Sequence, residues 1–270
     1  MSTGPMVIKV GGTTLEDQRT APALWKAVAD LHRSHAGGVV LVHGGGKAVD
    51  AHLARLGFTT ERREGIRITP ADQLEEIVAV LAGRINKSLV GALARVGVKA
   101  VGLCLGDGGS IPTVKSARYG FDPGRVGEVV PNAADAGALL RVLLRHGYLP
   151  VLSSIGLDAA GEFLNINADD AAAGVAGALA ADTLVLLTDV PGILDAERRV
   201  IPETTPGAID AMIASGVIAG GMIPKVRAAA DAASATRAPV IILSGNDPEA
   251  FASWTAGKPV GTRVLPARGR

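Results

Sequence analysis

The sequence predicts an α/β protein built on a mainly parallel β-sheet. Six short runs rich in Val, Leu and Ile recur along the chain, and segments with helical spacing separate them. The runs are continuously apolar rather than alternating, which is typical of strands buried on both faces of a parallel sheet. Many of the 35 glycines cluster after these runs, as expected where strands turn sharply into helices.

The predicted elements follow from these runs in chain order. Strands are predicted at Val7–Val10, Val39–Val42, Val98–Leu103, Tyr148–Ser153, Thr183–Leu187 and Val240–Leu243. Helices are predicted between them at about 21–36, 47–56, 71–95, 132–146, 168–180, 206–215 and 225–236. Asn132 and Asn167 are predicted N-caps, and Pro131 and Pro206 lie where helices commonly begin.

Three segments break the alternation, because they are polar, punctuated by glycine and β-branched in places. We predict β-hairpins attached to the sheet edge at Thr59–Ile68, Ile111–Val130 and Ser153–Ile166. No Pro- or Ser-rich linker divides the chain. The sequence therefore predicts one domain over residues 1–270, with a cleft between two lobes that meet near 181–183.

Composition excludes several classes of protein. Apolar residues make up 48% of the chain, enough for a large core, while a net charge of +1 offers no basic surface for nucleic acid. The single cysteine, Cys104, excludes an intrachain disulfide framework and is typical of a reducing compartment. Asp182 interrupts the longest apolar stretch, and the first strand begins too early for a signal peptide. We therefore expect a cytoplasmic protein without membrane or nucleic-acid partners.

Two glycine turns, each at the end of an apolar strand, are the strongest functional signal. Gly11–Gly12 follow the first strand, and Gly44–Gly46 follow the second. Consecutive glycines expose backbone N–H groups to an approaching anion, and the helix that follows adds positive potential. Neither turn is a G-x-x-x-x-G-K-[ST] loop or a G-x-G-x-x-G fingerprint. Together they predict a phosphate cradle made by neighbouring strand ends.

Two lysines lie beside glycine turns. Lys9 ends the first strand, where a buried ammonium needs an anionic partner. We interpret it as a cation that contacts a transferred phosphoryl group; the alternative is an edge lysine that reaches water. Lys225 follows Gly220–Pro224 near a helix start and repeats the pattern, with an ordinary surface lysine as the alternative.

Other polar residues lie at strand ends. Arg67, flanked by apolar residues, could present a planar fork to a carboxylate, or form a surface salt bridge. Alternation places Asn165 and Asn167 on one strand face, and Asp169 falls in the first helical turn that follows. Capping of the following helix accounts for the presence of Asn167 and Asp169 but not for Asn165. This favours a role for Asn165 in a binding site.

The segment Thr188–Asp195 offers polar groups and a Pro-Gly turn after another strand, as in a nucleotide pocket, or simply a turn. His43 and Cys104 lack partners at metal-ligand spacing, so we expect no protein metal site.

Together, the motifs K-V-G-G, H-G-G-G, G-I-R-I-T-P, N-I-N-A-D, T-D-V-P-G-I-L-D and G-G-M-I-P-K resemble those of the amino acid kinase family, in order from about Val7 to Thr262. The resemblance implies an open three-layer α/β/α sandwich. Its N-terminal lobe, about 1–182, would bind the acceptor and carry the dimer contact, and its C-terminal lobe, about 183–270, would bind ATP. It also implies that ATP, with Mg²⁺ carried by the nucleotide, phosphorylates the γ-carboxylate of N-acetyl-L-glutamate in arginine biosynthesis.

The resemblance also assigns roles. It implies that Lys9 and Lys225 steady the charge on the moving phosphoryl group, and that Asp169 orients both lysines. Acceptor binding is implied for Gly45, Gly46, Arg67 and Asn165. Nucleotide binding is implied for Gly11, Gly12, Asp189, Val190, Pro191, Gly192, Ile193, Leu194, Val217, Ile218 and Ala219.

This chemistry agrees with the residues present. A carboxylate acceptor, with a reference pKa of about 4.3, is already ionised at neutral pH, so transfer needs positioning and charge neutralisation rather than a general base. Family members inhibited by arginine carry an additional N-terminal helix, whereas only about five residues precede the first strand here. We therefore expect a homodimer without that feedback.

Other functions stay open at this point. A sister kinase acting on a carrier-protein-bound aminoadipate or glutamate should carry a basic docking surface, for which Arg62 and Arg63 are too few. Aspartokinase should carry a regulatory extension beyond residue 265, and carbamate kinase matches the acceptor motifs poorly. A non-catalytic sensor with this fold has no need to retain Lys9, Lys225 and Asp169 together.

Overall fold

A single twisted sheet organises the molecule. The structure is a computed structural model that describes the chain apart from residues 1–3, 12, 17–20, 221 and 268–270. Within this part of the chain, eight strands form the main sheet in the order β12-β14-β13-β11-β1-β2-β8-β5. The strand bounds are β1 Met6–Val10, β2 Val39–His43, β5 Ala100–Cys104, β8 Leu149–Ser153, β11 Thr183–Thr188, β12 Glu203–Thr204, β13 Val240–Ser244 and β14 Thr262–Val264.

The sheet is mainly parallel, as predicted from the continuous apolar runs. Strand β1 is central and pairs in parallel with β2 and β11, so Val10 lies opposite both His43 and Leu187. Only the pair β13–β14 is antiparallel among the described pairs of this sheet. The carboxyl ends of β1, β2 and β11 therefore meet at one edge of the sheet.

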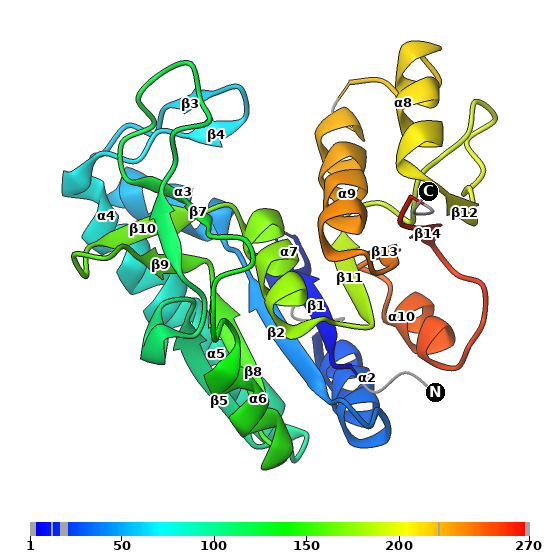
Figure 1. The fold of residues 1–270 in the computed structure, drawn as a ribbon, viewed down its shortest axis with the longest axis horizontal. Coiled ribbons are helices and arrows are strands. Elements are labelled where there is room, and N and C mark those ends of the chain that lie inside the picture. Colours follow the sequence, from blue (N-terminus) through cyan, green and yellow to red (C-terminus); the bar gives the residue numbers. More distant parts are fainter. Residues whose placement is uncertain (1–3, 12, 17–20, 221, 268–270) are drawn as a thin grey trace.

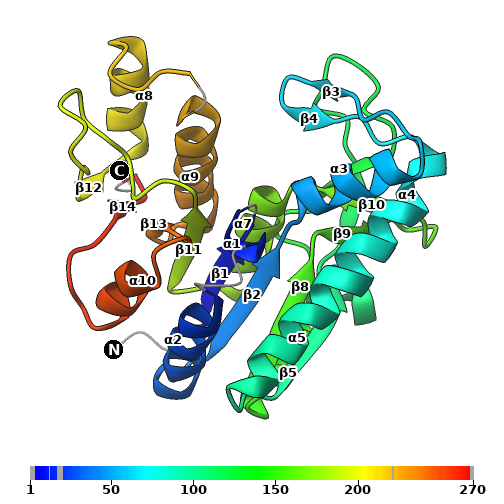
Figure 2. The same ribbon diagram turned by 180° about the vertical axis from the view of Figure 1, so that it is seen from behind.

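Helices cover both faces of the sheet and complete a three-layer α/β/α sandwich (Figures 1 and 2). The helical bounds are α1 Thr13–Glu16, α2 Ala21–Ser34, α3 Gly46–Arg55, α4 Ala71–Val78, α5 Asn86–Arg95, α6 Ala138–Arg145, α7 Ala168–Leu179, α8 Pro206–Ala214, α9 Met222–Thr236 and α10 Pro248–Thr255. Helices α6, α7, α8 and α9 contribute to the core on one face, and α2, α5 and α10 to the core on the other. Neighbouring strand residues alternate between the two cores, as Val7 and Ile8 do. The predicted sandwich is confirmed.

The predicted hairpins form, but not at the edge of the main sheet. Strands β3 Arg62–Arg63 and β4 Ile66–Arg67 make a separate two-stranded sheet. Strands β6 Thr113–Lys115, β7 Val126–Val129, β9 Ile155–Leu157 and β10 Phe163–Ile166 make a separate four-stranded sheet. Attachment to the main sheet was therefore a wrong prediction, because β10 pairs with β7 and β9 instead.

Local signals at helix ends were partly correct. Asn167 caps α7, since its side chain accepts hydrogen bonds from the backbone of Asp169 and Asp170, and Pro206 begins α8. Asn132 is not an N-cap: its backbone is left-handed, with φ of 53°, and α6 begins six residues later, after Gly137. Pro131 likewise begins no helix, because α6 runs over Ala138–Arg145. Elements β12, β14 and α10 were not predicted.

One helical stretch among the described residues, Ala71–Arg95, is long and apolar enough to cross a membrane by length and composition alone. It comprises α4, a π-helical stretch at Ala79–Ile85 and α5. Its residues Ile77, Leu81 and Leu93 are buried in the core beside the sheet. We therefore assign this stretch as a core helix of the α/β fold.

His43, the last residue of β2, is fully buried. Its Nδ1 lies 3.0 Å from the carbonyl oxygen of Gly44, and its Nε2 lies 3.2 Å from Nδ2 of Asn86. A carbonyl only accepts hydrogen bonds, so Nδ1 carries the proton and Nε2 accepts from Asn86. Burial lowers the pKa of His43 to about 4, so the ring is neutral at neutral pH.

We predict that His43 makes the protein less stable in acid. Between pH 6.5 and 4 the unfolded chain binds a proton that the native His43 does not, so the free energy of unfolding should fall by roughly 3 kcal/mol. Urea denaturation of the wild type and of His43→Gln across this range measures the effect. The variant should show a shallower loss of stability, and identical pH slopes in the two proteins would contradict the prediction.

Candidate active site

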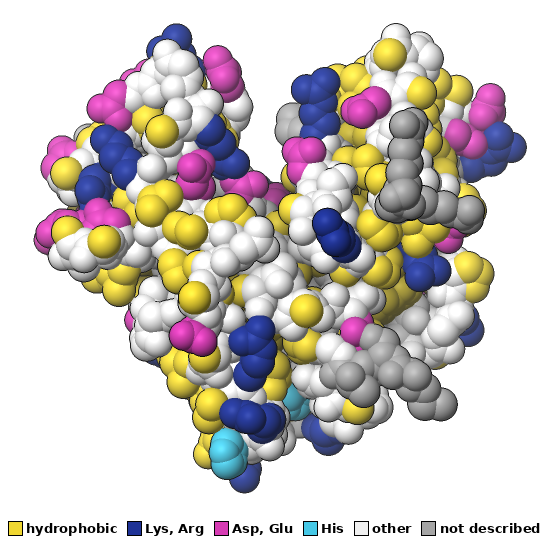
Figure 3. Space-filling view, viewed as in Figure 1, with side chains coloured by type: hydrophobic (Ala, Val, Ile, Leu, Met, Phe, Trp, Pro, Cys, Tyr) yellow, Lys and Arg dark blue, Asp and Glu magenta, His cyan; other side chains and the backbone are white. Residues whose placement is uncertain are grey.

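A groove opens at the sheet edge where β1, β2 and β11 end. In the space-filling view it appears as a deep notch between the two halves of the molecule (Figure 3). Two cavities, of about 230 and 260 Å³, lie along it, and both are lined by Lys9 and Gly11. Ligands of open α/β sheets bind outside the carboxyl ends of the strands, which is where these cavities lie. Gly12 lies outside the described residues.

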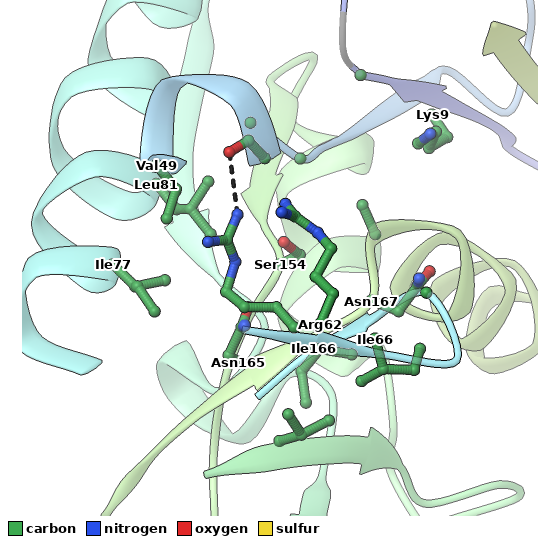
Figure 4. A pocket seen from close by; sticks show the side chains of 18 of the residues that line it. Lys9, Val49, Arg62, Ile66, Ile77, Leu81, Ser154, Asn165, Ile166 and Asn167 are labelled. Carbon is green, nitrogen blue, oxygen red and sulfur yellow. Dashed lines mark hydrogen bonds between the residues drawn. The ribbon is translucent and has the colours of Figure 1, made fainter. Parts of the chain in front are cut away.

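The first cavity brings the predicted acceptor-binding residues together. Gly45, Gly46, Arg67 and Asn165 all line it, with Lys9 at one side and the apolar side chain of Ile77 at the other (Figure 4). These residues come from β1, α3, β4 and β10, so the tertiary fold alone joins them. The fold thus brings the four residues together at one cavity, and their role in acceptor binding stays a prediction.

Arg67 is held rigidly in this cavity. Its guanidinium donates to Oδ1 of Asp50 at 2.6 Å and to the carbonyl oxygen of Gly46 at 3.0 Å, and only 9% of its side chain is exposed. Arg62 donates to the other carboxylate oxygen of Asp50 at 2.7 Å. Partial burial would raise the pKa of Asp50, but the two arginines outweigh it and hold that pKa below its ordinary value. The surface salt bridge considered for Arg67 therefore exists, yet it positions the arginine at a cavity wall.

Asn165 is anchored through a buried threonine. Its Nδ2 donates to Oγ1 of Thr69 at 3.0 Å, and Thr69 is fully buried. Thr69 in turn accepts a backbone hydrogen bond from Arg125 and donates its own N–H to the carbonyl of Pro123. The amide of Asn165 therefore has a fixed orientation at the wall of the first cavity, as expected of a residue that selects a polar ligand.

The second cavity is strongly charged. It is lined by Lys9, Lys47, Asp169, Asp189 and Lys225, together with residues of β11. Lys9 forms an ion pair with Asp169 across 3.0 Å, and the lysine side chain is only 14% exposed. Lys225 hydrogen-bonds to Oδ1 of Asp189. This bond holds the pKa of Asp189 below its ordinary value, and the charge of Lys47 acts in the same direction.

The predicted role of Asp169 needs a correction. The resemblance implied that Asp169 orients both lysines, but among the described side chains it pairs with Lys9, while Lys225 pairs with Asp189. The two pairs join different elements: Asp169 in the first turn of α7 meets Lys9 of β1, whereas Lys225 of α9 meets Asp189, which follows β11. Each lysine therefore has its own carboxylate.

Only some of the residues predicted to bind the nucleotide line the second cavity. Gly11 and Asp189 line the second cavity. Ile193 and Ile218 are almost completely buried in the core, so they support the loops rather than line this cavity. The remaining predicted residues lie on the same two loops without lining either cavity: Val190, Pro191, Gly192, Leu194, Val217 and Ala219.

Sequence analysis missed several lining residues. Lys47, which lines the second cavity, directly follows Gly46, so its position after the glycine turn was a usable signal.

Tyr119 lines the first cavity from the loop between β6 and β7 and stacks on Phe121, with ring centroids 5.4 Å apart. The guanidinium of Arg63 on β3 lies 4.5 Å from the Phe121 ring centroid. The loop between β6 and β7 and the β3–β4 hairpin therefore pack together beside the first cavity. No local sequence motif predicts this contact.

No cluster of three or more His, Cys, Asp or Glu side chains suited to a metal ion occurs among the residues that the structure describes. The carboxylates of Asp169 and Asp189 nevertheless line the second cavity.

Comparisons with known proteins agree with this geometry. The profile of the Amino acid kinase family matches residues 5–244. The acetylglutamate kinase of Proteus mirabilis (strain HI4320) is 41% identical over 261 residues, covering 97% of this chain and 99% of that protein.

Two solved structures share the fold. One is N-acetylglutamate synthase from Neisseria gonorrhoeae complexed with coenzyme A and N-acetyl-glutamate, with a TM-score of 0.82 and 22% identity over 100% of this chain and 61% of that one. The other is carbamate kinase from Giardia lamblia bound to AMP-PNP, with a TM-score of 0.68 and 21% identity over 98% and 99% of the two chains.

The glycine turn provides a test of the cavity architecture. A Cβ at Gly45 would lie 2.2 Å from Cδ1 of Ile85 and 2.9 Å from Cδ2 of Leu81. We predict that Gly45→Ala destabilises the protein by about 1–3 kcal/mol, because the packed side chains of Ile85 and Leu81 must move away from the new methyl group. Gly46→Ala is the matched control, since the nearest atom to its Cβ is 4.0 Å away. Thermal denaturation should show a clear drop in Tm for the first variant only, and equal Tm values would contradict the prediction.

Proposed function

The chain belongs to the amino acid kinase family, and on that premise we propose that it transfers the γ-phosphoryl group of ATP to the γ-carboxylate of N-acetyl-L-glutamate. The observation that carries this function is the pair of adjoining cavities that share Lys9 and Gly11 at the sheet edge. The activity agrees with the names of relatives that are about 41% identical over nearly the whole chain.

The first cavity suits the acceptor. Arg67 offers a planar guanidinium, held by Asp50, to the α-carboxylate, and Asn165 offers an amide of fixed orientation. Ile77 and Leu81 supply an apolar wall for the acetyl and methylene groups. Lys9 lies at the boundary with the second cavity, where the γ-carboxylate would meet the phosphoryl group.

The second cavity suits the polyphosphate of the nucleotide. Lys9 from β1 and Lys225 from α9 both line it, each paired with its own carboxylate. Mg²⁺, carried by the nucleotide, neutralises charge on the phosphate oxygens when bound. The residues of the chain hold the reactants in line, and no proton needs to be abstracted from an ionised carboxylate.

The same lining residues support the proposed division into lobes. All residues that line the first cavity precede residue 183. The second cavity is lined by residues 186–189, Lys225 and Ile242 together with the N-terminal residues Lys9, Gly11, Lys47 and Asp169. This supports an acceptor lobe at about 1–182 and a nucleotide lobe at about 183–270, in the cytoplasm where ATP and reduced cysteine are available.

A homodimer is also part of the proposal. Strand β5 is the last strand of the main sheet, and its residues are half-buried. An edge strand of this kind can pair with another copy, and the long helix Ala71–Arg95 beside it leaves part of its surface exposed. These two features support association through the N-terminal half.

An acceptor panel tests the proposed function. Wild-type protein with Mg²⁺ and ATP should release ADP with N-acetyl-L-glutamate, and much more slowly with L-glutamate or L-aspartate, because only the first carries the acetyl group. A preference for either free amino acid would contradict the assignment. If none of the three acceptors leads to ADP release, the result would instead favour a non-catalytic binding protein.

We predict that Lys9→Ala lowers kcat by about 10²–10³-fold in the same assay, because the phosphoryl group loses its most buried cation. The far-UV circular dichroism spectrum should stay unchanged. Lys26→Ala, at an exposed ion pair on α2, is the matched control. Undiminished turnover by Lys9→Ala would remove this lysine from the mechanism.

The proposed dimer can be tested by measuring the molar mass of the protein in solution. Size-exclusion chromatography with light scattering should give twice the mass of the 270-residue chain at micromolar concentration. A monomer or a hexamer would contradict the proposed dimer.

A further inference from the structure

The second cavity contains a third lysine that neither the sequence motifs nor the proposed chemistry uses. Lys47 lines this cavity together with Lys9 and Lys225, against two aspartates, Asp169 and Asp189. Three ammonium groups bring positive charge to a cavity of about 260 Å³, and like charges this close together favour an anion between them. The cavity is therefore suited to a ligand that carries several negative charges.

The position of Lys47 directs it toward the polyphosphate. It is the second residue of α3, immediately after the glycine turn at the end of β2. The first turn of a helix adds positive potential and leaves backbone N–H groups available to an anion. Lys47 therefore adds a positive charge to an end of α3 that already favours phosphate.

Lys47 also acts across the groove. Its charge contributes to the lowered pKa of Asp189, which follows β11 on the other side of the cavity. Asp189 is the carboxylate that holds Lys225. Lys47 on α3 and Lys225 on α9 thus line one cavity from two different helices.

We propose that Lys47 is a third catalytic lysine, which binds the γ-phosphate of the nucleotide from the α3 side and stabilises its charge during transfer. This inference rests on the proposed function. As transfer occurs, a γ-carboxylate oxygen of the acceptor forms a bond to the γ-phosphorus, and the bond from that phosphorus to the bridging oxygen breaks. The bridging oxygen keeps the electron pair and leaves with ADP, while Lys47 remains protonated and provides only charge.

Nucleotide binding tests the inference without any acceptor. Isothermal titration should show that Lys47→Met weakens Mg²⁺–AMP-PNP about tenfold and Mg²⁺–ADP less than twofold, because only AMP-PNP carries a γ-phosphate. Lys47→Arg should recover most of the AMP-PNP affinity, since it keeps the charge. Lys26→Met, on the exposed surface of α2, is the control for loss of one positive charge.

Steady-state kinetics adds a second readout. Lys47→Met should lower kcat about 10–100-fold and change the KM for N-acetyl-L-glutamate less than threefold. Equal weakening of both nucleotides, or no weakening of AMP-PNP, would overturn the role of Lys47. The acceptor panel with wild-type protein decides the proposed function separately, because it does not depend on Lys47.

Discussion

The ion pair between Lys9 and Asp169 is the contact on which both cavities depend. It joins the central strand of the sheet to the first turn of α7, and it lies where the two cavities meet. A charge buried to this degree is costly unless a counter-charge lies beside it. Asp169 is itself fixed by the Asn167 cap, so the position of the lysine is set by the start of a helix.

The second constraint on the site is the close packing of neighbouring elements against the backbone of the Gly44–Gly46 turn. The Cβ of a residue at position 44 would lie 3.0 Å from the Cβ of Ala168, and one at position 45 would clash with Ile85. The start of α7 and the long helix Ala71–Arg95 can therefore pack directly against the end of β2. This packing forms the wall of the first cavity and brings Asn165, Asn167 and Lys9 within reach of one ligand.

Three cations of the groove each have a carboxylate that positions them. Asp50 holds Arg67, Asp169 holds Lys9 and Asp189 holds Lys225. Separate partners keep the cations apart, so the protein supplies a preorganised field at two places, one for a carboxylate and one for a polyphosphate. The β3–β4 hairpin and the aromatic loop at Tyr119 pack together beside the first of these places.

The sequence by itself determined the features that depend on local physics. Apolar runs located the long strands, and the cap Asn167 and the helix-initial Pro206 located two helix starts, because both signals act within a few residues. The glycine turns and the lysine beside the first of them indicated the candidate site for the same reason. Very short elements such as β12 gave no signal, since two residues carry no period.

Only the tertiary structure decided how these pieces combine. It placed the hairpins in their own sheets, paired Lys225 with Asp189 rather than Asp169, and brought Asp50 to Arg67. It also brought Lys47 to the cavity that Lys9 and Lys225 share. These outcomes depend on contacts between residues far apart in the chain, and such contacts follow from the packing of whole layers rather than from any local pattern.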